Sequence, residues 1–123
     1  MSRKILIVDD EKDMSDILTL RLEANGYQVI KAYDGQEGLE MAHRENPDLM
    51  ILDLMLPKME GYKVCRLIKF DQKYKNIRII LFSARAQESD KKMGADVGAD
   101  AYIVKPFDPV VLLAKIRELL GEK

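Results

Sequence analysis

Five short runs of apolar, β-branched residues recur along the chain, and a segment with helical spacing follows each of them. The runs occupy residues 4–8, 27–32, 49–53, 77–82 and 101–105. Apolar residues on consecutive positions over such short lengths are typical of strands that are covered on both faces, as in a parallel sheet. Right-handed crossovers between such strands predict an α/β fold, a doubly wound five-stranded parallel sheet with five helices.

The segments between the runs carry apolar residues at steps of three and four, which predicts helices that pack on one side. In the first segment these residues are Met14, Ile17, Leu18 and Leu22; in the last, from Pro109 onward, they are Leu112, Leu113, Ile116, Leu119 and Leu120. The fourth helix, over about residues 86–97, is predicted to be weak. It has few large apolar residues, and its interior glycine costs about 1 kcal/mol relative to alanine.

The composition excludes several classes of protein. The 123 residues have a net charge of -1, which gives no electrostatic reason to expect nucleic-acid or membrane binding. Cys65 is the single cysteine, so no internal disulfide can form, and its apolar neighbours indicate a buried filler. No apolar run approaches the roughly 20 residues of a membrane span, and no signal peptide is recognisable. We therefore expect a cytoplasmic protein.

Polar residues stand where the predicted strands end. Asp9 and Asp10 follow the first strand, Asp53 ends the third, Ser83 follows the fourth and Lys105 ends the fifth. Because the carboxyl ends of parallel strands meet at one edge of the sheet, these side chains are expected to converge on one crevice. Asp9 and Asp10 could instead be helix caps, and Lys105 a solvated strand end.

The negative charge of this crevice indicates which ligands it can bind. The first loop, "DDEKDM", has no glycine and would repel the phosphates of a nucleotide or flavin. Three crowded carboxylates need a cation, and Mg²⁺ prefers such oxygen ligands. With the metal in place, one aspartate can act as a nucleophile toward phosphorus, as in aspartyl-phosphate chemistry. Lys105, Ser83 and Mg²⁺ could then cover the three oxygens of the transferred group.

Four motifs carry a family resemblance: "ILIVDDE", "PDLMILDLMLPKMEGY", "IILFSA" and "GADAYIVKPF". In this order and spacing the chain resembles the receiver domain of bacterial two-component response regulators, over essentially all of residues 1–123. The resemblance implies a flavodoxin-like sheet with strand order 2-1-3-4-5. It also implies a switch that receives a phosphoryl group from a histidine kinase or phosphotransfer protein.

The resemblance assigns roles to residues at the crevice. Asp53 would be the phosphoacceptor, and Asp10, Asp53 and the backbone carbonyl of Met55 would bind Mg²⁺, with Asp9 acting through a metal-bound water. Lys105 would pair with a phosphoryl oxygen.

The same resemblance assigns the residues of the switch. The bond between Lys105 and Pro106 would be cis. Ser83 would move toward the phosphoryl group, and Tyr102 would turn inward as Ser83 moves. The partner surface would comprise the fourth helix, fifth strand and fifth helix. Met55 and Arg85 would border the path of the attacking water and slow hydrolysis of the acyl phosphate.

Two other functions remain as alternatives. A haloacid-dehalogenase-like phosphatase also uses an aspartyl nucleophile, but it needs an acid two residues later, where this chain has Met55. A receiver-like module that only docks partners would not need Asp10, Asp53 and Lys105. The sequence leaves open the kinase, the downstream partner or output domain, a phosphorylation-dependent homodimer, and whether the chain is a piece of a longer regulator.

Overall fold

The sheet has five parallel strands in the order β2-β1-β3-β4-β5, which confirms the predicted topology. The computed structural model describes residues 3–84, 92 and 95–122. The strands are β1 (Lys4–Val8), β2 (Gln28–Ala32), β3 (Leu49–Asp53), β4 (Arg78–Ser83) and β5 (Ala101–Val104). The described helices are α1 (Lys12–Ala24), α2 (Gly35–Glu45), α3 (Gly61–Lys69) and α5 (Pro109–Leu119). The predicted fourth helix, over about 86–97, falls mostly outside the described residues.

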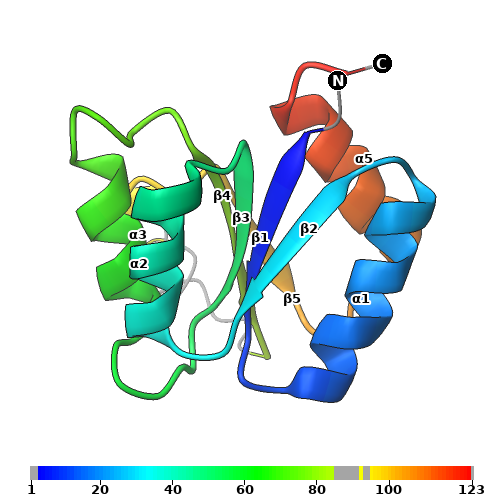
Figure 1. Cartoon of the computed structure of the whole chain (residues 1–123), viewed down its shortest axis with the longest axis horizontal. Coiled ribbons are helices and arrows are strands. Elements are labelled where there is room, and N and C mark those ends of the chain that lie inside the picture. Colours follow the sequence, from blue (N-terminus) through cyan, green and yellow to red (C-terminus); the bar gives the residue numbers. More distant parts are fainter. Residues whose placement is uncertain (1–2, 85–91, 93–94, 123) are drawn as a thin grey trace.

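Helices cover both faces of the sheet (Figure 1). Successive strand residues point to opposite faces, so each strand contributes to two cores. One core holds Leu6, Met50 and Leu81 with side chains of α2 and α3, and the other holds Ile7, Ile51, Ile80 and Phe82 with side chains of α1 and α5. The β-branched runs therefore form strands because both of their faces are buried.

One prediction about the first helix is wrong. Ile17 shares the helical spacing of Leu18 and Leu22, but its side chain is 66% exposed whereas those two are buried. Ser15 and Thr19 are also buried, so α1 packs on a face that includes small polar side chains. Apolar spacing alone cannot distinguish Ile17 from its buried neighbours, because the apolar stripe of α1 is wider than the part of the helix that contacts the core.

The helix ends follow from local chemistry. The Asp34 side chain caps α2 by accepting a hydrogen bond from the Glu37 backbone N–H at 2.8 Å, and Asn46 closes the helix in the left-handed conformation at φ 44°. Asp108 caps α5, and Pro109 occupies its first turn. Both helices therefore begin at an aspartate whose carboxylate accepts a backbone N–H of the first turn.

The single cysteine lies in the core, as predicted. Cys65 is fully buried, and burial raises the pKa of its thiol to about 12, so the nucleophilic thiolate is not formed near neutral pH. None of the described helices has the length and apolar character to cross a lipid bilayer.

Candidate functional site

Three charged side chains meet at the carboxyl edge of the sheet, which is the lower edge in Figure 1. Asp9 follows β1, Asp53 ends β3, and Lys105 follows β5. Asp9 is 3% exposed and Asp53 6% exposed, so both carboxylates lie away from bulk water. The Lys105 Nζ lies 3.0 Å from Asp53 Oδ2 and 3.2 Å from Asp9 Oδ2. The predicted convergence of these residues is therefore observed.

Each buried carboxylate is held by its own loop as well as by Lys105. Asp53 Oδ1 accepts a hydrogen bond from the Met55 backbone N–H at 3.0 Å, and Asp9 Oδ1 accepts one from the Glu11 N–H at 2.9 Å. In both cases the donor lies two residues after the aspartate, the geometry of an Asx-turn. One oxygen of each group thus faces the loop, and the other faces the ammonium.

Burial and charge act against each other in this site. Burial raises the pKa of Asp9 above its usual value, and the nearby charge of Asp53 adds to this, while the Glu11 N–H and Lys105 lower it. Burial alone would lower the pKa of Lys105, but hydrogen bonding to Asp53 and the charge of Asp9 outweigh it and raise the pKa. The ammonium therefore stays charged and partly neutralises the carboxylates.

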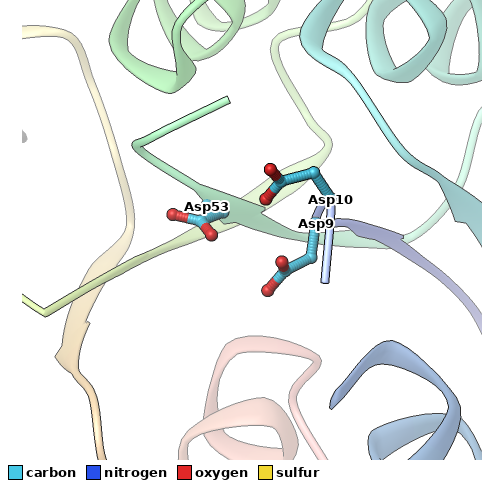
Figure 2. Close-up of side chains that lie close together, drawn as sticks. All are labelled: Asp9, Asp10 and Asp53. Carbon is cyan, nitrogen blue, oxygen red and sulfur yellow. The ribbon is translucent and has the colours of Figure 1, made fainter. Parts of the chain in front are cut away.

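The acidic cluster also contains Asp10, which is exposed. One oxygen from each of Asp9, Asp10 and Asp53 lies within 4.8 Å of the others. Figure 2 shows the three side chains projecting from the ends of the adjacent strands β1 and β3. A hard dication such as Mg²⁺ takes oxygen ligands and uses only a few carboxylates, so this donor set fits it. Lys105 supplies one positive charge beside three carboxylates, so a dication could neutralise the two negative charges that remain.

The remaining predicted residues lie around this cluster. Ser83 is buried at the end of β4, and its backbone carbonyl accepts a hydrogen bond from the Lys105 N–H at 2.7 Å. The bond between Lys105 and Pro106 is cis. Tyr102 is half-buried in β5 and packs against the core beneath α2 and α3. The Met55 side chain is 63% exposed beside Asp53.

Arg85, the other predicted kinetic residue, lies outside the described residues.

Two neighbours of Lys105 were not predicted. Glu11 Oε1 lies 4.0 Å from the Lys105 Nζ, and the ring centroid of Phe82 lies 5.6 Å from it. Phe82 faces the same side of the sheet as Asp53, which follows only from the register of β3 with β4. The crevice was predicted from the polar residues at the strand ends, so this apolar ring was not included.

Comparison with known proteins indicates one family. The family profile described as "Response regulator receiver domain" matches residues 5–117. The alkaline phosphatase synthesis transcriptional regulatory protein PhoP of Bacillus subtilis is 42% identical over 120 residues, which is 98% of this chain and 49% of that protein. The chain thus spans about half the length of this curated relative.

Solved structures give the same result. A CheY-like response regulator receiver domain protein from Methanospirillum hungatei superposes with a TM-score of 0.92 at 34% identity, covering 98% of this chain and 95% of that one. The chemotaxis response regulator CheY4 of Vibrio cholerae gives 0.90 at 30% identity, covering 97% and 99%. Because both the family profile and the fold match, this chain belongs to the response regulator receiver domain family.

Proposed function

We propose that this chain is a phosphorylation-dependent signalling switch whose phosphoacceptor is Asp53. The observation that carries the proposal is the pairing of one ammonium, Lys105, with the buried Asp53 and Asp9 beside the exposed Asp10. The donor would be a phosphohistidine on a histidine kinase or phosphotransfer protein. The resulting change of surface would alter the binding of a downstream partner. The B. subtilis relative is named a transcriptional regulatory protein, and an output of that kind is proposed here too.

The transfer step follows from the contacts of Asp53. Its Oδ1 is held by the Met55 N–H, so Oδ2 is the oxygen placed next to the Lys105 ammonium. A carboxylate oxygen of Asp53 attacks phosphorus, the bond from phosphorus to the histidine nitrogen breaks, and the electron pair stays on the imidazole. Lys105 then exchanges its carboxylate partner for a phosphoryl oxygen. Catalysis of such a step is mostly positioning and charge neutralisation.

Asp10, Asp53 and the Met55 carbonyl would hold Mg²⁺, with Asp9 reaching it through a water. The ion supplies the charge that the transferred phosphoryl oxygens need and that one lysine cannot provide. Asp9 already accepts hydrogen bonds from the Lys105 ammonium and from the Glu11 N–H, which agrees with binding the ion through a water rather than directly.

The direct test uses acetyl phosphate and Mg²⁺, with intact mass as the measurement. The wild type is expected to gain one phosphoryl group, and Asp53→Asn none, because an amide oxygen is a poor nucleophile. Asp13→Asn, at an exposed carboxylate of α1, is the matched control and should gain the group normally. Chelation of Mg²⁺ should block the gain. Uptake by Asp53→Asn equal to wild type would exclude Asp53 as the acceptor.

The switch itself would involve Ser83 and Tyr102. Phosphorylation adds about −1.5 to −2 of charge at the site, which attracts the Ser83 hydroxyl. Tyr102 would then turn further inward, and the surface formed by the fourth helix, β5 and α5 would follow. A bias of a few kcal/mol is enough for such a population shift.

We expect the resonance of Tyr102 to move when Mg²⁺ and beryllofluoride, a phosphoryl mimic, are added to 3-fluorotyrosine-labelled protein. Tyr27 serves as the internal control, because it is buried far from the site and its hydroxyl donates to Glu122 Oε1 at 2.7 Å. Fluorine NMR records both, and Tyr102→Phe assigns the signal. An unchanged chemical shift of Tyr102 while the mimic binds would refute this switch.

Met55 and Arg85 would set the lifetime of the acyl phosphate. The Met55 side chain is exposed and its backbone N–H holds Asp53 Oδ1, so this side chain would border the path of the attacking water. Met55→Glu is expected to speed hydrolysis about fivefold, since lowering a barrier by ~1 kcal/mol has that effect. Loss of the added mass over time measures it, with Lys58→Gln, which changes the net charge by the same −1 at an exposed position, as the control for charge alone. An unchanged lifetime would remove Met55 from the mechanism.

A further inference from the structure

The Lys105 side chain has to cross a strand to reach Asp53. In the sheet, β4 lies between β3, which carries Asp53, and β5, which precedes Lys105. Phe82 is the β4 residue in register with Asp53 on one side and with Ile103 on the other. Ile103 and Lys105 are two residues apart, so Asp53, Phe82 and Lys105 all face the same side of the sheet. The Phe82 ring therefore occupies the position over which the lysine must pass.

The contact between ring and ammonium has the geometry of a cation–π interaction. The Lys105 Nζ lies 5.6 Å from the ring centroid of Phe82, within the range of about 6 Å in which such attraction is effective. Phe82 is 1% exposed, so water does not compete for its face. Phe107 packs on Phe82 with ring centroids 4.6 Å apart and a tilt of 48°, which fixes the orientation of the ring.

We propose that Phe82 is a positioning residue that holds the Lys105 ammonium in place for phosphoryl transfer to Asp53. Asp53 and Asp9 attract the ammonium from one side, while the negative face of the ring supports it from the other and excludes water there. An aliphatic side chain would fill the same space without attracting the cation. The inference rests on the proposed function, since it concerns the same transfer step.

A double-mutant cycle separates positioning from packing. The initial rate of phosphorylation by acetyl phosphate with Mg²⁺ is measured for wild type, Phe82→Leu, Lys105→Met and the double variant. Phe82→Leu is expected to slow the wild type about fivefold, which corresponds to ~1 kcal/mol. It should cause no further slowing in the Lys105→Met background. Ile80→Val, two residues earlier on the same buried face, is the control and should act equally in both backgrounds.

Two results would overturn the proposal. Phe82→Leu could react as fast as wild type, or it could slow both backgrounds by the same factor, as a purely structural role requires.

A second readout does not depend on phosphorylation. The same four proteins are unfolded in urea, and Phe82→Leu is expected to raise the unfolding equilibrium constant about fivefold more when Lys105 is present than in the Lys105→Met background. If this coupling is found but the wild type accepts no phosphoryl group, the proposed function is wrong, but the stabilising contact between Phe82 and Lys105 is confirmed. If the wild type is phosphorylated and neither cycle shows coupling, the positioning role is wrong and the proposed function stands.

Discussion

Lys105→Met is expected to lower the free energy of unfolding by about 3 kcal/mol when no divalent cation is present. Lys105 is the cation that pairs with Asp53 and Asp9, and all three side chains are mostly buried. Removing one member of a buried ion pair leaves its partners uncompensated, and here two carboxylates would be left facing each other. Urea unfolding near neutral pH measures the loss.

The same experiment with Mg²⁺ separates charge from packing. The ion should restore much of the stability of Lys105→Met, because it supplies positive charge to the same carboxylates. Lys63→Met, at an exposed position of α3, is the control and should change stability by less than about 0.5 kcal/mol. Equal stability of wild type and Lys105→Met would contradict the view that these carboxylates are ionised and crowded in the folded chain.

Gly61→Ala is expected to displace the backbone that carries Asp53. A Cβ at Gly61 would overlap the Asp53 carbonyl oxygen and would lie 2.8 Å from Leu54 Cα, so the backbone that carries the phosphoacceptor must shift. The Gly61 N–H also donates to the Leu54 carbonyl at 3.1 Å. We expect a loss of about 3 kcal/mol in stability, the upper end for overpacking, together with slower phosphorylation.

The comparison for Gly61→Ala is Lys63→Ala, in the same helix turn but exposed. It should leave both stability and phosphorylation close to wild type, since alanine is a good helix former. Thermal or urea unfolding and the acetyl phosphate reaction give the two readouts. Normal values for Gly61→Ala in both would show that the start of α3 does not constrain Asp53.

The strands and their order were predictable because their signal is local and repeated. Buried runs such as residues 4–8 and 49–53 have the predicted bounds, and the others differ by one residue at one end or, for β4, at both. The convergence of Asp9, Asp53 and Lys105 was predictable as well, since parallel topology brings the carboxyl ends of strands together. Both features follow from the backbone topology alone.

Features that depend on side-chain geometry could not be predicted in this way. The sequence suggested that a metal must neutralise the carboxylates, whereas in the structure Lys105 already pairs with two of them. Ile17 has the spacing of a core residue but lies outside the contact of α1. The support of Lys105 by Phe82 depends on register across two strand pairs, which no single segment encodes.

A crystal structure grown with magnesium salt and beryllofluoride tests the proposed chemistry most directly. We expect one octahedral ion ligated by Asp10, Asp53 and the carbonyl oxygen of residue 55, the mimic attached to an Asp53 oxygen, and the Lys105 ammonium on a fluorine. Carboxylates turned away from one another, with no cation between them and Asp53 unmodified, would contradict the account.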